Sequence, residues 1–551
     1  MMMTGAQCVT DALQREGVTV VFGIPGGHTI PLTDVMYDRP EMTFVVTRHE
    51  GGAACAADGY ARASGRPGVC LATAGPGATN LLTGVGGALR DSSPVIVLTC
   101  NNQRKDIGFG DVQDANHEAI FAPLTKWSVT VNDVRAIPRV MREAFRRALT
   151  GAPGPVHIDF PREILAETLD ASEEVEPEHY RPTTPLAPAP ELVTRGVARL
   201  LEAARPVLWL GAGVQRARGS AAAVDFAEQL GLPVLTTFNA FGTVPTRHPL
   251  VFGARSRMGI SLTQRILEEA DLVVAVGNSL DAVSTSRWLL RLPALIHVDV
   301  EPLVLGRHYP FEIGIVGDAR RTLEAFAAEA GRAGGSTARW AGWRETLASW
   351  QAEWRKGIYR EEWDHATPMK PQTIMRALDA VLTPETTLCV DASNPGIWSL
   401  MLDLPRGLTY MRPVNFGNMG FALPAAIGAG LARPDQQVIA LLGDGSLGMS
   451  LGELETAVRT GVRLAIVLMN NRVLGNIRQE QLYKLKAPRY IGVEFGEVDF
   501  PAVARACGGG GERVDRPEEL PAALKRAVSS TVPYLLDITT DPDESVWNHP
   551  I

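Results

Sequence analysis

Two hydrophobic runs in the last third of the chain each end in small polar residues. The run VIALL is followed by residues 443–446 (GDGS), and the run RLAIVLM is followed by residues 470–471 (NN). The carboxyl ends of parallel strands meet at one edge of a sheet, where helix N-termini present free N–H groups to anions. The glycines let the backbone approach phosphate oxygens closely, and the side-chain oxygens of Asp444 and Asn471 suit Mg²⁺ or Ca²⁺. Either turn alone is common, but the two together predict a site for a metal-bound diphosphate.

The GDG turn, the amphipathic segment, the buried run and the NN turn resemble the cofactor motif of thiamine diphosphate enzymes. In that family the aspartate, the second asparagine and a backbone carbonyl two residues later hold the metal. The resemblance therefore implies Asp444, Asn471 and the carbonyl of Val473 as ligands of Mg²⁺. It also implies that the diphosphate is contacted from both sides of the site, by Gly443, Gly445, Ser446, Gly475, Ser393 and Asn394.

The resemblance also requires a carboxylic acid from a second domain. In these enzymes the acid protonates N1′ of the aminopyrimidine, which makes the 4′-imine tautomer accessible and allows the C2 carbanion to form. The segment RHEGGAACAADGYAR places Glu50 at the end of a predicted strand and before a helix of small residues, and it resembles the family's activating glutamate. Without that helix, a His-Glu pair is typical of a solvated strand end. We expect Glu50 to be the activating acid.

Three shorter segments resemble other parts of the family's cofactor site. Residues 22–29 (FGIPGGHT) resemble its PGG turn, and residues 74–80 (AGPGATN) resemble the turn that faces the aminopyrimidine. Residues 415–424 (NFGNMGFALP) resemble the element that bends the cofactor. This implies Met419 as the wedge under the ring junction and the carbonyl of Gly417 as acceptor from the 4′-amino group. Taken alone, Met419 would be plain core packing, although its unbranched, polarisable side chain suits an irregular gap. The positions implied in the first two turns are Pro25, Gly26, Gly27, Pro76 and Asn80.

The order of the motifs is similar to that in acetolactate synthase and its pyruvate oxidase, decarboxylase and carboligase relatives. The resemblance implies a carboligase that decarboxylates pyruvate or another 2-oxo acid and transfers the acyl carbanion to a second carbonyl. A 2-oxo acid decarboxylase or a C–C lyase of the same superfamily is an alternative. A non-catalytic binding or regulatory subunit is another, but Glu50, Asp444 and Asn471 are all present, which favours an enzyme.

The residues on the substrate side depart from the family pattern. Gln113 aligns with a phenylalanine–glutamine–glutamate segment of the family, but Val112 and Asp114 replace its outer residues. This departure leaves the preferred acceptor substrate open. His28 follows PGG where acetolactate synthases usually carry alanine, and an imidazole there could move a proton to or from the substrate. Glu480 stands where pyruvate oxidase-like members place a carboxylate above the thiazolium. A histidine filling a turn and a glutamate on a wet helix face are the structural alternatives. The predicted catalytic set is Glu50, His28, Gly27, Gln113 and Glu480.

A flavin site in the central part of the chain is uncertain from the sequence. Acetolactate synthases and pyruvate oxidases bind FAD there, and Gly211, Gly213 and Arg255 could cradle a dinucleotide. However, GxG after a strand is a weak signal by itself. The chain also reads GARSRMG and GNSLDAV where the family usually has MxGxHG and GxRFDDR. We expect no tightly bound flavin, and a structural rather than a redox role if one binds.

Strands must end where these polar turns begin. Apolar runs such as VTVVFGI, SPVIVLTC and QVIALLGDG alternate with helix-length segments throughout the chain, which is typical of parallel sheets covered on both faces. The pattern breaks at the acidic, proline-rich residues 167–192 and again near Ala330. We therefore predict an α/β protein of three doubly wound parallel-sheet domains. These are an aminopyrimidine-binding domain over 1–170, a central domain over 190–332, and a diphosphate- and Mg²⁺-binding domain over 368–545.

The bulk composition argues against several other classes of protein. The 551 residues are 45% hydrophobic and 21% charged, which is ordinary for a globular protein, and a net charge of −8 without a basic stripe argues against nucleic-acid binding. The six cysteines show no CxxC spacing, which argues against a disulfide or zinc framework. Because no signal peptide or membrane-length apolar run is recognisable, we expect a cytoplasmic protein. The family's catalytic domains face each other across two subunits, so the resemblance implies a homodimer or homotetramer.

Overall fold

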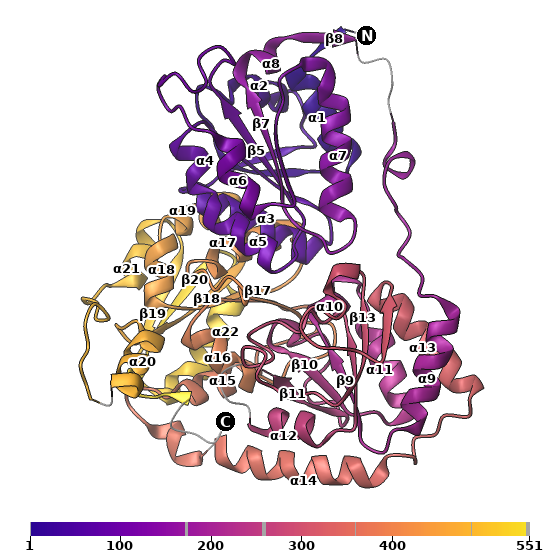
Figure 1. Ribbon diagram of the computed structural model, residues 1–551. Coiled ribbons are helices and arrows are strands. Elements are labelled where there is room, and N and C mark those ends of the chain that lie inside the picture. Colours follow the sequence, from indigo (N-terminus) through magenta and orange to yellow (C-terminus); the bar gives the residue numbers. More distant parts are fainter. Residues whose placement is uncertain (1, 171–174, 256–260, 359, 486, 547–551) are drawn as a thin grey trace.

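The computed structural model describes residues 2–170, 175–255, 261–358, 360–485 and 487–546. Three six-stranded sheets follow one another along the chain, and every pair of neighbouring strands in them is parallel. Each sheet is flanked by helices (Figure 1). The predicted fold of three doubly wound α/β domains is confirmed.

The N-terminal domain has the strand order β3-β2-β4-β5-β7-β6. The strands are β2 (Val20–Ile24), β3 (Thr43–Val46), β4 (Gly68–Ala72), β5 (Val95–Asn101), β6 (Trp127–Thr130) and β7 (Val156–Pro161). Apolar residues of α1 (Gly5–Arg15), α2 (Ile30–Tyr37) and α7 (Ile137–Leu149) cover one face of the sheet. Those of α3 (Glu50–Ser64) and α5 (Leu82–Arg90) cover the other. The short strands β1 (Met2–Thr4) and β8 (Thr168–Asp170) pair antiparallel.

The central domain repeats this scheme with the order β11-β10-β9-β12-β13-β14. Its strands are β9 (Pro206–Leu210), β10 (Val234–Thr237), β11 (Val251–Arg255), β12 (Leu272–Val276), β13 (Ala294–Asp299) and β14 (Ile313–Val316). The surrounding helices are α9 (Pro190–Glu202), α10 (Ala212–Arg216), α11 (Ser220–Leu230), α12 (Ser261–Glu269) and α13 (Ala319–Arg332). The long helix α14 (Ala341–Ile358) then runs along the base of the molecule to the third domain (Figure 1).

The C-terminal domain has the order β16-β15-β17-β18-β20-β19. Its strands are β15 (Thr387–Val390), β16 (Thr409–Met411), β17 (Val438–Gly443), β18 (Leu464–Asn470), β19 (Gly510–Val514) and β20 (Tyr534–Thr539). Its main helices are α15 (Pro371–Asp379), α16 (Asn394–Trp398), α17 (Ala422–Ala432), α18 (Asp444–Ser450), α19 (Glu453–Thr460), α20 (Gly475–Leu485), α21 (Phe500–Ala506) and α22 (Leu520–Ser529).

Each sheet contains a point where the direction of winding reverses. The reversals lie between β2 and β4, between β9 and β12, and between β15 and β17. Connections leave such a pair of strands toward opposite faces, so a crevice opens beyond their carboxyl ends, and ligands of open α/β sheets bind there. The topology therefore supplies three candidate crevices, one in each domain.

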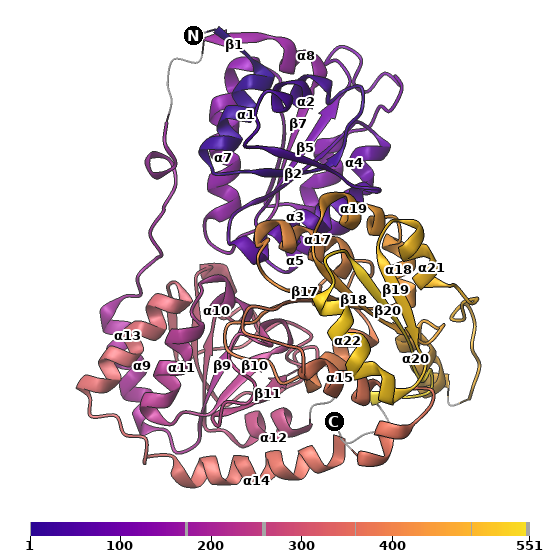
Figure 2. The same cartoon turned by 180° about the vertical axis from the view of Figure 1, so that it is seen from behind.

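The N-terminal domain rests on the C-terminal domain through helices α3 and α17, as the views from both sides show (Figures 1 and 2). The two helices are rich in glycine and alanine, and their backbones nearly touch. A Cβ atom on Gly59 would lie 2.2 Å from the carbonyl oxygen of Ala425, and one on Gly428 would lie 1.9 Å from that of Ala56. The small residues after Glu50 are thus explained by packing within one chain.

Residues 175–189, which precede the central domain, follow the outside of the molecule (Figure 2). In the part of the chain that the structure describes, no helix combines the length and apolar character that crossing a membrane requires.

Candidate functional site

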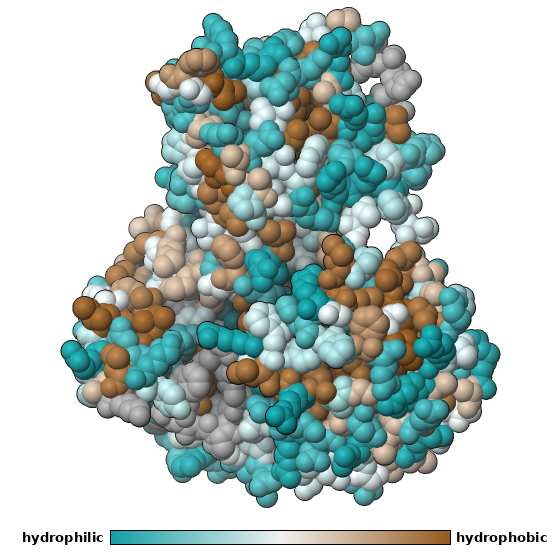
Figure 3. Space-filling view, in the orientation of Figure 1, coloured by the Kyte–Doolittle hydropathy of each residue, from teal (hydrophilic) through white to brown (hydrophobic). Residues whose placement is uncertain are grey.

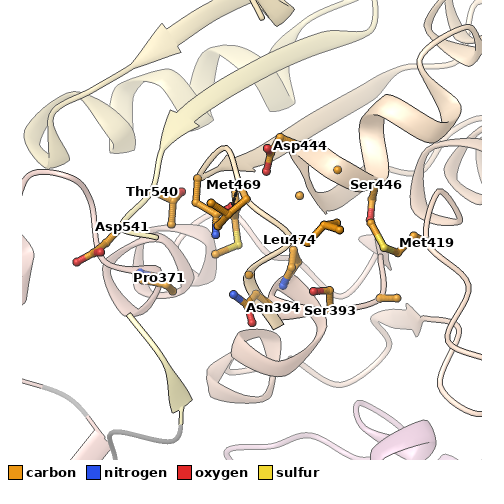
Figure 4. A pocket seen from close by; sticks show the side chains of 17 residues that line it. Pro371, Ser393, Asn394, Met419, Asp444, Ser446, Met469, Leu474, Thr540 and Asp541 are labelled. Carbon is orange, nitrogen blue, oxygen red and sulfur yellow. Dashed lines mark hydrogen bonds between the residues drawn. The ribbon is translucent and has the colours of Figure 1, made fainter. Parts of the chain in front are cut away.

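The main candidate site is a pocket of about 450 Å³ beyond the carboxyl ends of β15, β17 and β18 (Figure 4). It lies at the winding reversal of the C-terminal sheet. The structure brings together in its lining most of the residues predicted for diphosphate and metal: Ser393, Asn394, Met419, Gly443, Asp444, Gly445, Ser446, Asn471, Val473 and Gly475. Pro371, Ala392, Pro395, Met469, Leu474, Thr540 and Asp541 complete the lining.

The first wall of the pocket is the turn from β17 into α18. Asp444 opens the helix and is buried, and burial raises the pKa of its carboxyl group to about 6. A bound cation stabilises the ionised form of a carboxyl group that is held in a buried site. In the next turn, Arg472 has a left-handed φ of +55°, and the backbone N–H of Val473 donates to Oδ1 of Asn471 at 3.2 Å. The donor set is one carboxylate, one amide and one carbonyl, which are oxygen ligands suited to Mg²⁺.

The opposite wall is formed by Ser393 and Asn394 at the start of α16 (Figure 4). Ser393 has a left-handed φ of +73°, which turns the chain sharply after β15. Gly475 lies against this wall, since a Cβ atom there would be 2.3 Å from Nδ2 of Asn394. Glycine at 475 therefore leaves room for the side chain of Asn394 in its present position.

The loop that carries Met419 is held by Asp391, a residue that the sequence interpretation missed. One carboxylate oxygen of Asp391 accepts from the N–H of Gly420 at 3.2 Å and the other from the N–H of Ala422 at 2.8 Å. The thioether of Met419 reaches the pocket next to Gly445, whose Cβ position is 3.2 Å from Cε of Met419. Gly417 is exposed, has a φ of +72° and does not line the pocket. The only signal for Asp391 in the sequence was its position directly after a predicted strand.

A second cluster lies at the carboxyl ends of β2, β3 and β4 in the N-terminal domain. Glu50 is 8% exposed and begins α3, with His49 as the N-cap. Nδ2 of Asn80 donates to Oε2 of Glu50 at 2.9 Å, so one residue of the AGPGATN turn orients the predicted acid. Gly77 of the same turn packs close by, with its Cβ position 3.4 Å from Oε1 of Glu50. Pro76, the first residue of α4 (Pro76–Asn80), is exposed.

His28 belongs to this cluster and is hydrogen-bonded through both ring nitrogens. Nε2 lies 2.8 Å from Oδ1 of Asn102, and Nδ1 lies 3.1 Å from Oγ1 of Thr73. Because Nδ2 of Asn102 donates to the carbonyl of Val112, its Oδ1 must be the acceptor, so His28 carries its proton on Nε2. Sequence interpretation missed Thr73 and Asn102, which are 45 and 74 residues from His28 along the chain.

The turn before His28 has three different environments. A Cβ atom on Gly26 would lie 2.6 Å from Thr73, so glycine is required where the ends of β2 and β4 meet. Pro25 and Gly27 are exposed. Two residues of the turn therefore face solvent, and Gly26 packs against Thr73.

Gln113 is exposed, and its φ is +63°. Its backbone packs against Gly75, whose Cβ position is 2.7 Å from the carbonyl oxygen of Gln113. The N–H of Gly75 donates to Nε2 of His117, whose Nδ1 lies 2.8 Å from Oδ1 of the buried Asp159. His117, which is 1% exposed, thus holds the turn of Gly75, against which the backbone of Gln113 packs.

The two clusters do not form one site within the chain. All residues that line the C-terminal pocket lie between Pro371 and Asp541, and none comes from the N-terminal domain. Glu480 does not line the pocket, and its carboxylate lies 2.6 Å from Nζ of Lys484 on the same helix. Among the described residues, no three His, Cys, Asp or Glu side chains gather as a metal site.

The third crevice is an open cavity of about 2900 Å³ beyond the ends of β9 and β12. Gly211 and Gly213 line it, but packing accounts for both glycines. A Cβ atom on Gly211 would lie 2.1 Å from the carbonyl oxygen of Gly277, and one on Gly213 would lie 2.7 Å from its Cα. Arg255 does not line the cavity and instead donates to Ser286 at 2.7 Å.

Comparison with known protein families shows to which family the chain belongs. Family models match residues 3–120 as the N-terminal TPP-binding domain of thiamine pyrophosphate enzymes, 193–326 as their central domain, and 391–538 as their C-terminal TPP-binding domain. The chain belongs to the thiamine pyrophosphate enzymes. The predicted family is confirmed, and its cofactor, thiamine diphosphate, is the same compound as thiamine pyrophosphate.

Several relatives of this thiamine pyrophosphate enzyme carry one name. The probable acetolactate synthase large subunit of Methanocaldococcus jannaschii is 35% identical over 99% of this chain and 93% of its own length. The acetolactate synthase large subunit of Corynebacterium glutamicum is 34% identical over 99% and 88%. The large subunit of acetolactate synthase isozyme 2 of Escherichia coli is 33% identical over 99% and 97%. This member of the family is therefore similar to acetolactate synthase large subunits along nearly its whole length.

Proposed function

We propose that the protein is a thiamine diphosphate-dependent carboligase of the acetolactate synthase type. It would decarboxylate pyruvate or another 2-oxo acid and join the remaining acyl unit to a second carbonyl compound. The observation that carries this proposal is the C-terminal pocket, in which Asp444, Asn471 and Val473 face Ser393 and Asn394 across a space beyond the strand ends. The whole-length similarity to acetolactate synthase large subunits supports the choice of reaction.

We infer that Asp444, Asn471 and the carbonyl of Val473 would hold Mg²⁺, and that Ser446 and Gly475 would contact the diphosphate. When bound, the cofactor supplies an electron sink for loss of the carboxyl group from a 2-oxo acid. The chain's own contribution is to fix that sink in place and to keep the surrounding space dry. The buried carboxyl group of Asp444 suits this task because a divalent cation offsets the cost of ionising it there.

Glu50 would hold a proton against the aminopyrimidine. It is nearly enclosed, and Asn80 fixes one of its oxygens, which leaves the other free to face a ligand.

We propose that two copies of the chain complete each site. The pocket is lined by the C-terminal domain alone, and the Glu50 cluster is in the N-terminal domain. Large apolar side chains are exposed on both domains, including Ile30, Phe109 and Val112 on the first and Met449, Ile477, Leu482 and Ile491 on the second. Figure 3 shows hydrophobic surface on the flanks of both domains. A homodimer, alone or paired into a tetramer, would cover these residues.

The substrate would meet the loop of Gln113 and the ring of His28. We propose that Gln113 reaches the acceptor from its exposed, left-handed position, and that Gly27 is a further residue on the substrate side. His28 would orient a substrate oxygen, because its ring is fixed by Thr73 and Asn102. Glu480 remains a prediction for a carboxylate near the cofactor, as does the cytoplasmic location of the protein.

A second candidate function is a 2-oxo acid decarboxylase or C–C lyase of the same family. The observation that favours it is the hydrogen-bonded set Thr73, His28 and Asn102. A polar group on the substrate side could donate a proton to the acyl carbanion, whereas a carboligase adds that carbanion to a second carbonyl compound. Incubation with pyruvate, Mg²⁺ and thiamine diphosphate separates the two, because acetolactate indicates a carboligase and acetaldehyde a decarboxylase.

For the central cavity we propose no tightly bound FAD. Packing against Gly277 accounts for the glycines that suggested a dinucleotide site, and Arg255 is turned toward Ser286.

The test of the main proposal is cofactor-dependent release of CO₂ from a panel of 2-oxo acids. The wild-type protein should release CO₂ only with thiamine diphosphate and a divalent cation, and Asp444→Ala should abolish this release. If no 2-oxo acid yields CO₂ under any of these conditions, the protein is a non-catalytic member and the proposal is wrong.

A further inference from the structure

Helix α19 of the C-terminal domain lies against the N-terminal domain at the segment that leads into Glu50. The two views place α19 beside the base of the N-terminal domain (Figures 1 and 2), and α19 contacts strand β3. Arg459 of α19 donates to the carbonyl of Val46, the last residue of β3. A longer contact of 3.9 Å joins Arg48 and Glu455. The segment between β3 and α3 is therefore held from outside its own domain.

The central contact is made by Glu453, which is 2% exposed and which no proposed step of the reaction uses. Its Oε1 accepts from the backbone N–H of Arg48 at 3.0 Å and from that of His49 at 3.1 Å. Its Oε2 accepts from the hydroxyl of Thr456 at 2.7 Å. Arg48 and His49 immediately precede Glu50, so Glu453 fixes the two peptide groups from which the predicted acid projects.

Two glycines make room for this contact. A Cβ atom on Gly52 would lie 2.3 Å from Oε1 of Glu453, and one on Gly452 would lie 2.9 Å from Cβ of Arg48. One carboxylate oxygen accepts from both N–H groups, and a backbone N–H group that loses its partner in a partly buried position costs free energy. Nothing else in the described part of the chain accepts from these two N–H groups.

We propose that Glu453 is a positioning residue for Glu50. It acts through the peptides of Arg48 and His49, so the C-terminal domain sets the place of an acid that belongs to the N-terminal domain. This inference rests on the role of Glu50 in the proposed function. The hydrogen bonds indicate that the shape of the Glu453 side chain, and not its charge, is what positions Glu50. Its Oε1 accepts from two N–H groups, and its Oε2 accepts from the hydroxyl of Thr456, which could equally accept a hydrogen bond.

A glutamine at 453 can reproduce every contact. Its amide oxygen would accept from both N–H groups, and its NH₂ group would donate to Oγ1 of Thr456. Glu453→Gln should therefore keep turnover within about threefold of wild type, since hydrogen bonds of this kind are modest in net free energy when all partners remain satisfied. Glu453→Ala removes the acceptor of both N–H groups, and a displacement of Glu50 by about 1 Å can lower turnover by about 100-fold.

A glycine substitution provides a test that leaves Glu453 itself unchanged. In Gly52→Ala the new Cβ atom would push the carboxylate away, while alanine favours the helix that contains residue 52. Gly342→Ala is the matched control, because a Cβ atom there, in the first turn of α14, meets nothing within 4 Å. In the full chain without cofactor, amide hydrogen exchange of residues 46–52 should accelerate in Gly52→Ala and stay at the wild-type rate in Gly342→Ala.

With cofactor added, Gly52→Ala should lower kcat by about 30-fold or more and change the KM for thiamine diphosphate by less than about threefold, since the acid is displaced while the diphosphate pocket is untouched. The inference is overturned if kcat of Gly52→Ala stays within threefold of Gly342→Ala, or if residues 46–52 keep their protection. It is also overturned if Glu453→Gln is as inactive as Glu453→Ala, because charge would then be the cause.

A double-mutant cycle with Glu50→Gln separates this inference from the proposed function. If Glu453 acts through Glu50, then adding Glu453→Ala to Glu50→Gln should change the remaining rate by less than about twofold. A further large loss would indicate a general structural role and overturn the inference alone. Wild-type turnover of Glu50→Gln would instead overturn the role of Glu50 in the proposed function.

Discussion

The pocket of the C-terminal domain and the cavity of the central domain are built on the same plan. Both lie beyond strand ends where the winding of a six-stranded parallel sheet reverses, and both are approached by Gly-x-Gly turns. In the C-terminal turn, a Cβ atom on Gly443 would have no neighbour closer than 3.8 Å. In the central turn, a Cβ atom on Gly211 would lie 2.1 Å from a carbonyl oxygen.

The difference shows what a glycine in such a turn indicates. A glycine whose missing side chain faces open space leaves room for a ligand, whereas one whose missing side chain faces a neighbouring backbone is needed for folding. The first kind supports a binding site, and the second kind supports none. Four substitutions or additions test this comparison.

The largest effect is expected for Gly211→Ala. The new Cβ atom would overlap the backbone of Gly277, which cannot move without disturbing β12, so the free energy of unfolding should fall by about 3 kcal/mol. Denaturant unfolding measures this. Gly448→Ala, in α18, is the control because a Cβ atom there meets nothing within 4 Å, and it should be as stable as wild type. Equal stability of the two variants would contradict the packing role of Gly211.

Asp391→Asn should mainly weaken the binding of the cofactor. The amide NH₂ group would face the N–H of either Gly420 or Ala422, which leaves one of them unpaired and frees the loop of Met419. We expect the affinity for thiamine diphosphate to fall by about 10- to 100-fold, in line with the loss of one buried hydrogen bond of about 1–3 kcal/mol. Titration calorimetry measures it, and unchanged affinity would show that Asp391 does not hold the loop.

Gly443→Ala should fold normally and bind the cofactor less well. The nearest atoms to the new Cβ are Cγ of Pro395 and the carbonyl of Met469, which both line the pocket, so the methyl group would occupy ligand space. We expect a stability within about 1 kcal/mol of wild type and an affinity for thiamine diphosphate lower by about tenfold, or 1.4 kcal/mol. A variant that loses stability but keeps its affinity would reverse the comparison with Gly211.

The smallest effect is expected for FAD. If the central glycines serve packing, adding FAD to the purified protein should change kcat by less than about twofold, which corresponds to less than 1 kcal/mol. Flavin absorbance of the purified protein and turnover before and after its removal measure this. A loss of turnover that FAD restores would assign a required flavin to the central cavity.

The sequence alone predicted which short segments come together to line the C-terminal pocket. Asp444, Asn471 and Val473 lie within one turn–helix–strand–turn unit, so their spacing along the chain reflects their spacing in space. The apolar runs likewise predicted the three parallel sheets, because each strand is buried on both faces.

Residues that support the site through distant contacts could not be predicted in this way. Asn102 lies 74 residues from His28, and Glu453 lies 404 residues from His49. No local period or motif marks either residue, and only the packing of the domains brings them to the site. Arg255 illustrates the reverse case, since a strand-end arginine suggested a ligand but the fold buries it against Ser286.

The most direct test of the account is titration of thiamine diphosphate into the protein with and without Mg²⁺, for wild type and Asp444→Ala. The account predicts binding to wild type that requires the cation, and no measurable binding to Asp444→Ala at the same concentrations. Cation-dependent binding of wild-type affinity in Asp444→Ala would contradict the assignment of the C-terminal pocket.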